Sequence, residues 1–399
     1  MLKKINQLLF STIRIGKKVN IPFAVLVWFS LPLIAVFAEL LHGKINNYLI
    51  YRYVFSHSLE QKNLYLFYPA RFEDCNHYGP FFSLIIAPFA LLPDAVGVVL
   101  WVIANTWFLY FAIKQLPFTQ KAIHIIFLIC AIELMTASHN VQFNPMLAAW
   151  IILSYTLVKK GNDFWATLFI VAGFMVKIYG IVGLLFFLFS DNKLKFIASF
   201  LFWSVVLFCL PMFISSPGFI VQSYIDWKDS LVLKDSQNSI LGNMQDISVQ
   251  GMIRRIFVYR QLPNIAVLVP AALLLVMPLL RLQLYKNVMF QLYYLALLLI
   301  TVVIFSSSAE SPTYIIAVCG AALWFVMNMH HNRKSDKLLL AFVILLTSLS
   351  PTDLFPRYIR QHFVVTYALK ALPCLLVWLM VITKVAFAKN ESLKSPEIL

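Results

Sequence analysis

Charged and amide side chains interrupt this mostly apolar sequence at few places, and these are the residues that could do chemistry. Glu73 and Asp74 are adjacent carboxylates, either of which could accept a proton from a hydroxyl group. Lys177, Arg254 and Arg255 could neutralise a phosphate. Side chains that could bind the hydroxyl groups of a sugar are Asn47, His77, Tyr78, Glu133, Gln142, Asn144, Asn238 and Glu310. Acids, amides and cations together suit a substrate that carries both a sugar and a phosphate.

The acids also have structural interpretations. Loop carboxylates such as Glu73 and Asp74 are usually solvated. Glu133 stands near the end of an apolar run, where an acid is functional by default but could also pair with His139. The catalytic and the structural interpretation both stay open for these residues.

The amides and cations have structural interpretations as well. Gln142 and Asn144 could cap the helix that follows them. Lys177 could extend towards lipid headgroups, and Arg254 and Arg255 could bind lipid phosphates without specificity. These alternatives stay open beside the role in substrate binding.

The apolar runs of the sequence must form the structural elements that hold these polar residues in place. Of the 399 residues, 61% are hydrophobic and 12% are charged, compared with roughly 25% charged in a soluble domain. The net charge of +15 lies in short basic clusters between the runs, which favours membrane lipids and not nucleic acid as partners. The sequence predicts an all-α integral membrane protein, a single domain over residues 1–399, with twelve spans at 21–40, 95–113, 121–137, 145–158, 163–176, 178–190, 194–214, 263–281, 287–306, 313–328, 337–349 and 363–385.

The basic clusters predict the orientation of the spans. They fall on one face of the membrane only if residues 79–93 do not cross it, and this face is then the cytoplasmic one. We therefore expect a cytoplasmic lead (1–20) and tail (386–399) in a plasma (inner) membrane protein. The outer face receives the first outer loop (41–94), the second large outer loop (215–262) and most of the polar candidates.

Some segments are predicted to lie within or along the membrane without crossing it. Residues 79–93 would rise only about 22 Å as a helix, short of a hydrocarbon core of about 30 Å, and are predicted to be re-entrant. The 26 residues of "FWATLFIVAGFMVKIYGIVGLLFFLF" favour two half-length helices that meet at "KIYG". Amphipathic interfacial helices are predicted within "NNYLIYRYVFSHSLEQ" and "VQGMIRRIFVYRQL".

Familiar signatures of soluble enzymes do not occur in the sequence. It contains no GxGxxG after a strand, no Walker loop, no GxSxG and no HExxH, and its five cysteines show no CxxC spacing. We therefore expect no metal site and no cofactor. From the residues alone, an outward polar cavity would also describe a transporter.

Three blocks carry a resemblance to a known family. They are "LYLFYPARFEDCNHYGPFFSLIIAPFALLPD" with the run after it, "VQFNPMLAAWIILSYTLVKKGND" and "AGFMVKIYGIVGLLFFLF". Over residues 21 to about 330, their order and spacing are similar to the DUF2029 family, GT87, of polyprenol-phosphate-sugar-dependent glycosyltransferases. The resemblance implies the GT-C fold and transfer of a hexose, usually mannose, from a polyprenyl-phosphate-linked donor to a glycolipid or glycan acceptor on the noncytoplasmic face.

The family's motifs map onto this sequence residue by residue. Its GQxN block is "VQFN" here and marks Gln142 and Asn144, and its KxxP block is "KIYG" and marks Lys177. "SQNSILGNM" followed by "VQGMIRRIF" resembles the family's Asn-Gln-Ser stretch before an Arg-Leu pair. The resemblance implies that the three marked residues contact the donor or the acceptor.

The sequence also departs from the family pattern. Asn47 stands where the family has an acid, so Asp74 or Glu73 would have to replace the missing base. The glycine of GQxN is Val141 and the proline of KxxP is Gly180.

The family's SPxSW motif survives only as the Ser-Pro of "AESPTY". We expect Glu310, which precedes it, to supply part of the lost polarity.

These observations predict an inverting sugar transfer. Asp74 would deprotonate the acceptor hydroxyl, cations would hold the phosphate, and the lipid phosphate would leave as an anion without help from an acid. Two alternatives stay open: a transporter or flippase of a lipid-linked sugar, and an inactive GT-C relative.

Overall fold

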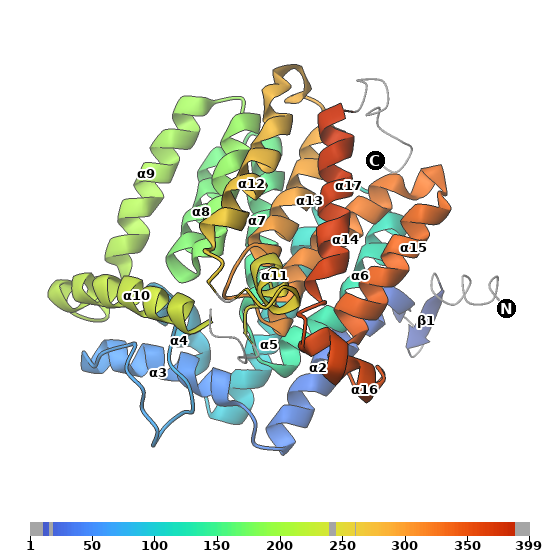
Figure 1. Cartoon of the computed structure of the whole chain (residues 1–399). Coiled ribbons are helices and arrows are strands. Elements are labelled where there is room, and N and C mark those ends of the chain that lie inside the picture. Colours follow the sequence, from blue (N-terminus) through green and yellow to red (C-terminus); the bar gives the residue numbers. More distant parts are fainter. Residues whose placement is uncertain (1–10, 16–18, 239–244, 260, 388–399) are drawn as a thin grey trace. The chain divides into compact units, whose positions relative to one another are not determined.

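The computed structural model describes residues 11–15, 19–238, 245–259 and 261–387 (Figure 1). The chain divides into two compact units, each built from separated stretches of sequence. Unit 1 comprises Met1–Ala35, Ile113–Ser138 and Leu241–Leu399, and unit 2 comprises Val36–Ala112 and His139–Ile240. Of the predicted cytoplasmic lead and tail, residues 1–10, 16–18 and 388–399 lie outside the described residues.

Helices make up almost all of the regular structure, as the apolar runs predict. A two-stranded antiparallel sheet, β1 (Thr12–Ile15) and β2 (Val19–Pro22), lies in the predicted lead. The α-helices are α2 (Phe23–Leu41), α3 (Asn46–Glu60), α4 (Phe82–Ala90), α5 (Asp94–Lys114), α6 (Gln120–His139), α7 (Asn144–Lys159), α8 (Asp163–Val176), α9 (Lys193–Cys209), α10 (Pro217–Asn238), α11 (Val249–Ile256), α12 (Ile265–Val276), α13 (Val288–Ile304), α14 (Tyr314–Asn328), α15 (Lys334–Phe342), α16 (Arg357–Ile359) and α17 (Ala371–Phe387).

Tighter and wider helices connect these elements. The 3₁₀ segments are η1 (Ile178–Phe189), η2 (Leu210–Phe213), η3 (Met277–Leu280), η4 (Leu282–Leu284), η5 (Ser311–Thr313) and η6 (Met329–His331). Two segments are π-helical, η7 (Val343–Leu349) and η8 (Arg360–Val365). π-Helical turns are rare in proteins, and those that occur are often found at functional sites.

Several helices are apolar enough to cross a membrane, so the chain has the character of a multi-pass membrane protein. Those that are also long enough are Phe23–Leu41, Asp94–Lys114, Gln120–His139, Lys193–Phe213 and Ser311–His331. Shorter apolar helices are Asp163–Val176, Ile178–Phe189, Ile265–Leu280, Val288–Ile304 and Ala371–Phe387. Each of the twelve predicted spans coincides with helical structure. The number that cross the membrane, and their direction, stay predictions.

In unit 1 the most deeply buried core lies between α13, α14 and α17, which pack side by side (Figure 1). Gly320 of α14 permits this approach, because a Cβ atom there would lie 2.6 Å from the carbonyl oxygen of Ala296 in α13. Trp378 of α17 is buried and donates a hydrogen bond of 2.7 Å from its Nε1 to Oγ1 of Thr301. A polar bond inside an apolar bundle fixes the register of the two helices.

In unit 2 the helices α7, α8, η1 and α9 pack together. The predicted break between two half-length helices is confirmed at Lys177, whose backbone is extended (φ −146°, ψ 121°). The chain then turns back as the 3₁₀ helix η1, and Gly180 lies so close to α8 that a Cβ atom would be 2.2 Å from the carbonyl carbon of Gly173. Of the two half-length helices, the first (α8) is an α-helix and the second (η1) is a 3₁₀ helix.

The first outer loop of the prediction contains the two expected helices. The apolar segment 79–93 forms only α4, whose nine residues rise about 14 Å, and α3 covers the predicted interfacial helix. Their placement in a membrane stays a prediction. The second large loop differs from the expectation, because residues 215–262 contain the 22-residue helix α10 as well as α11.

Gly79 joins the first loop to the end of α8. Its amide donates to the carbonyl oxygen of Val176 at 3.0 Å, and a Cβ atom on Gly79 would lie 2.0 Å from the carbonyl oxygen of Met175. We expect Gly79→Ala to lower the free energy of unfolding in detergent by about 1 to 3 kcal/mol. The reason is that the backbone near Met175 would have to move to relieve this overlap. Denaturant unfolding of the purified protein measures the change.

Gly218→Ala is the matched control for this substitution. A Cβ atom on Gly218 meets nothing within 4 Å and its backbone is not left-handed. Equal stability of the two variants would contradict the close approach at Gly79.

Candidate functional site

Unit 2 contains a polar cavity of about 310 Å³ between the loop before α4 and the helix α10. Its described lining is mostly polar and includes three carboxylates. The lining residues are Asn63, Tyr65, Leu66, Asp74, Cys75, His77, Asp226, Asp229, Ser230, Leu233, Lys234 and Gln237. Such a surface suits a ligand with several hydroxyl groups.

The structure separates the two predicted acids. Asp74 lines the cavity, and its Oδ1 accepts a hydrogen bond of 2.8 Å from the amide of Cys75. Glu73 is exposed and is not among the lining residues, and its amide donates to Oδ1 of Asn46 at 2.8 Å. Of the pair, Asp74 is therefore the acid that could meet a ligand in this cavity.

His77 lies in the same cavity and is largely buried. Its Nδ1 lies 3.2 Å from Oγ of Ser230, and its buried Nε2 has no hydrogen-bond partner among the described residues. Burial, assisted by the charge of Lys234 and opposed by Asp74, lowers the pKa of His77 to about 4. The imidazole is therefore neutral at pH 7 and could donate to or accept from a hydroxyl group.

The opposite wall of the cavity comes from α10, a helix within the predicted second large outer loop. Asp226 is held by Nδ2 of Asn63 and Nε2 of Gln222, both at 2.8 Å. Asp229, in contrast, is exposed, and among the described residues its ion-pair contact is with Lys228, at 4.0 Å. The signal that could have found this wall is the spacing of its polar residues at 226, 229, 230, 234 and 237, which follows one face of a helix.

A second polar cluster in unit 2 joins the residues marked by the family motifs. Nζ of Lys177 donates to Oδ1 of Asn144 at 2.9 Å, and Nδ2 of Asn144 lies 3.4 Å from Oε1 of Gln142. The hydroxyl of Tyr78 donates to the same Oε1 at 3.3 Å. The ammonium group also lies over the ring of Tyr179, 4.7 Å from its centroid. Four predicted site residues are thus brought together.

This cluster and the cavity are close enough to influence each other. His77 and Tyr78 are consecutive, and the charges of Lys177, Asp74 and Lys234 all act on the pKa of His77. The predicted catalytic acid and the predicted phosphate ligand Lys177 therefore belong to one polar region of unit 2.

Asn47 lies at the start of α3, at the edge of this region. Its Nδ2 donates to the carbonyl oxygen of Asn140 at 2.7 Å, next to the block that holds Gln142. A carboxylate cannot make this bond, because it has no proton to donate. An amide at this position is therefore consistent with the local structure.

The remaining predicted residues have internal partners. In unit 1, Arg254 is 3% exposed and its NH1 lies 2.9 Å from Oδ2 of Asp246. Glu133 is fully buried and forms a salt bridge of 2.8 Å with Lys370. The alternative pairing of Glu133 with His139 is wrong, because His139 lies 2.6 Å from Glu39.

Two further candidates lie at helix ends. Glu310 forms a capping box with Thr313 at the start of η5. Asn238 is the last residue of α10, is buried, and is not among the residues that line the cavity. A role in substrate binding stays a prediction for both. Arg255 has an internal partner too, because its NH2 donates to the carbonyl oxygen of Gln245 at 2.8 Å, but it also lines a second cavity, in unit 1.

Comparison with known proteins supports the resemblance in the sequence. The sequence model of glycosyltransferase family 87 matches residues 76–307, more than half of the chain. No curated protein matches the chain. The match includes His77, Tyr78, the Gln142–Asn144 block, Lys177 and the whole of α10.

Val141 generates a prediction about strain at the site. It occupies the family's glycine position with φ 52°, a left-handed conformation that costs an L-residue roughly 1 to 2 kcal/mol, and it is 1% exposed. Val141→Gly loses more apolar contact than Val141→Ala but also relieves the strain. We therefore expect the two variants to have free energies of unfolding within about 1 kcal/mol of each other.

Val171, a buried residue of α8, is the matched control. There Val→Gly should be less stable than Val→Ala by about 1.5 to 2 kcal/mol, because glycine weakens a helix and loses a further methyl group. The same difference at both positions would show that the backbone of Val141 is unstrained.

Proposed function

Because the chain belongs to glycosyltransferase family 87, we propose that it transfers a hexose, mannose in the first instance, from a polyprenyl-phosphate-linked donor. The acceptor is a glycolipid or glycan, and the reaction takes place on the noncytoplasmic face of the membrane. The observation that carries this proposal is the cavity of unit 2, where Asp74 and His77 face Asp229 and Lys234. Three carboxylates, a neutral imidazole and a cation lie there together.

The reaction needs one base. In the proposed mechanism, Asp74 accepts the proton of an acceptor hydroxyl as its oxygen attacks the anomeric carbon of the donor sugar. The bond between that carbon and the phosphate oxygen breaks, and the lipid phosphate leaves with the electron pair. No acid is needed, because the phosphate is already a stable anion. No cofactor takes part, since the donor carries its own leaving group.

Cations and amides position the donor in this proposal. Lys177 and Lys234 stabilise the charge that develops on the phosphate. Lys234 was not among the predicted residues. Gln142 and His77 bind sugar hydroxyls, which neutral amide and imidazole groups can do as donors or acceptors. Asn144 is fully buried and holds Lys177 in place.

The proposed reaction is distinguished from transport by the fate of the donor. We expect the purified protein in detergent micelles to consume polyprenyl-phosphate mannose in the presence of a mannoside acceptor and to release polyprenyl phosphate. Mass spectrometry of both lipids and of the acceptor measures this. A transporter or flippase would leave the donor intact in micelles and would move it only across a sealed bilayer.

The role of Asp74 is tested by Asp74→Asn, which keeps the shape of the side chain but removes the base. We expect kcat to fall by about 100-fold to 10,000-fold, because general-base catalysis contributes this much, while the KM for the donor changes little. Steady-state rates of mannosyl transfer measure both constants.

Asp229→Asn and Glu73→Gln are the controls, one inside the cavity and one outside its lining. Both should retain most of the activity. Loss of activity in Asp229→Asn with normal turnover in Asp74→Asn would move the base to α10. Rescue of Asp74→Asn by Asn47→Asp would place the base at the family's position instead. An inactive relative would show no turnover in any of these proteins.

A further inference from the structure

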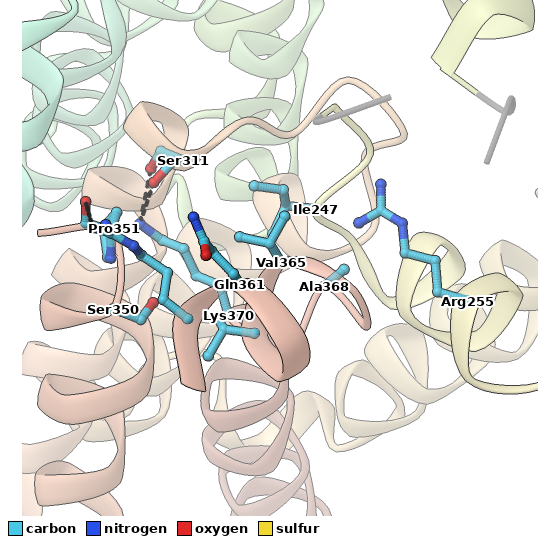
Figure 2. Close-up of a pocket in the computed structure, with 11 residues that line it drawn as sticks. Ile247, Arg255, Ser311, Ser350, Pro351, Gln361, Val365, Ala368 and Lys370 are labelled. Carbon is cyan, nitrogen blue, oxygen red and sulfur yellow. Dashed lines mark hydrogen bonds between the residues drawn. The ribbon is translucent and has the colours of Figure 1, made fainter. Parts of the chain in front are cut away.

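Unit 1 contains a second and larger cavity, of about 590 Å³. It lies between the loop before α11, the start of η5 and the segment from η7 to α17. The residues that line it are Ile247, Arg255, Ser311, Ser350, Pro351, Arg360, Gln361, Val364, Val365, Ala368 and Lys370. Figure 2 shows Arg255 on one side and Ser311 with Lys370 on the other, with Gln361 and Val365 between them.

The floor of this cavity is built by hydrogen bonds. Nζ of Lys370 donates to Oγ of Ser311 at 2.8 Å and to its carbonyl oxygen at 3.1 Å (Figure 2). The amide of Ile247 donates to the carbonyl oxygen of Ala309 at 2.8 Å, and the hydroxyl of Tyr314 donates to the carbonyl oxygen of Ile247 at 2.6 Å. The lining therefore comes from segments that are tied to one another.

The charge of the cavity is positive. Arg255, Arg360 and Lys370 line it, and no Asp or Glu is among its described lining residues. Glu133 pairs with Lys370 from inside the unit. NH1 of Arg360 lies 3.4 Å from Oδ1 of Asp353, an exposed acid outside the lining. The two arginines carry the positive charge that remains. Guanidinium groups with several donors recognise phosphate well.

About half of the lining residues are apolar, and the others include Ser311, Ser350 and Gln361 besides the cations. A cavity with both kinds of surface suits an amphiphilic ligand. Ile247, Pro351, Val364, Val365 and Ala368 supply a surface for hydrocarbon. The elements around the cavity also expose large apolar side chains to the surroundings: Leu354, Tyr358 and Phe363 beside Arg360, and Phe257 beside Arg255. Exposed apolar groups next to cations are typical of a surface that meets lipid.

No Asp or Glu is among the described lining residues, so this cavity lacks the carboxylate base that the proposed sugar transfer uses. Of the lining residues, only Ile247 and Arg255 lie within the segment that matches the family. The cavity is therefore largely built by a part of the chain that the family match does not include.

From this combination we propose that the cavity of unit 1 is a binding site for an anionic glycerophospholipid of the bilayer. Its phosphodiester lies against Arg255 and Arg360, and part of an acyl chain lies along Ile247, Val364 and Val365. This lipid is neither the sugar donor nor the acceptor.

Native mass spectrometry of the full-length protein tests the proposal. The protein is reconstituted in nanodiscs of phosphatidylcholine that contain a small share of phosphatidylglycerol, and is then released with its retained lipids. We expect selective retention of phosphatidylglycerol. Arg255→Gln and Arg360→Gln should each reduce it by about tenfold, the effect of one lost charge-assisted contact.

Arg357→Gln is the matched control. Arg357 is exposed, lies three residues before Arg360, and does not belong to the cavity lining. It should retain phosphatidylglycerol like the unaltered protein. Asp74→Asn should retain it too, so a failure of the proposed catalysis can be told apart from a failure of this inference.

Three outcomes would overturn the proposal. The first is equal retention of phosphatidylglycerol and phosphatidylcholine, and the second is equal loss in Arg357→Gln and Arg360→Gln. The third is displacement of phosphatidylglycerol by polyprenyl phosphate, with a higher KM for the donor in Arg255→Gln. That result would assign the cavity to the donor lipid.

Discussion

The contact between Gly79 and the end of α8 is the constraint on which the arrangement of unit 2 depends. The last carbonyl groups of a helix have no partner within it, and the amide of Gly79 satisfies that of Val176 at 3.0 Å. Because the residue after Val176 is Lys177, this single bond places His77 and Tyr78 beside the lysine. The loop that carries Asp74 enters the polar region through the same anchor. A helix end that would otherwise need a cap thus becomes the point where separate motifs meet.

The sequence predicts those helices that a pattern of neighbouring residues is enough to indicate. Apolar runs located helical structure at every predicted span, and the lysine within a 26-residue run located the break between α8 and η1. The helix α10 was missed because its residues are largely polar and hydropathy does not report it. Its regular polar spacing becomes informative only when the loop opposite, with Asn63 and Asp74, is known.

Pairings between distant residues could not be predicted. Glu133 and Lys370 are separated by 237 positions and form a buried salt bridge, whereas the nearest sequence partner, His139, pairs with Glu39. Arg254 and Arg255 are equivalent in the sequence, but successive residues of a helix point about 100° apart. One guanidinium is therefore buried against Asp246, and the other lines a cavity. Which residue of such a pair is available to a ligand depends on packing alone.

The departures from the family pattern are of two physical kinds. Val141 holds a left-handed backbone at the position that the resemblance assigns to glycine. Gly180, at the position that it assigns to proline, donates its amide to the carbonyl oxygen of Lys177 at 3.1 Å. At these positions the residue changes while the backbone still presents Gln142, Asn144 and Lys177 to one another.

Asn47 is different, because there the chemical group changes. Its amide donates to the carbonyl oxygen of Asn140, and a carboxylate would place a negative charge against that oxygen instead. A carboxylate at this position would therefore have to turn away from that oxygen, or the loop of Asn140, which leads directly to Gln142 and Asn144, would have to move. The proposed base Asp74 lines a cavity from a different loop, and its role there would leave this backbone undisturbed.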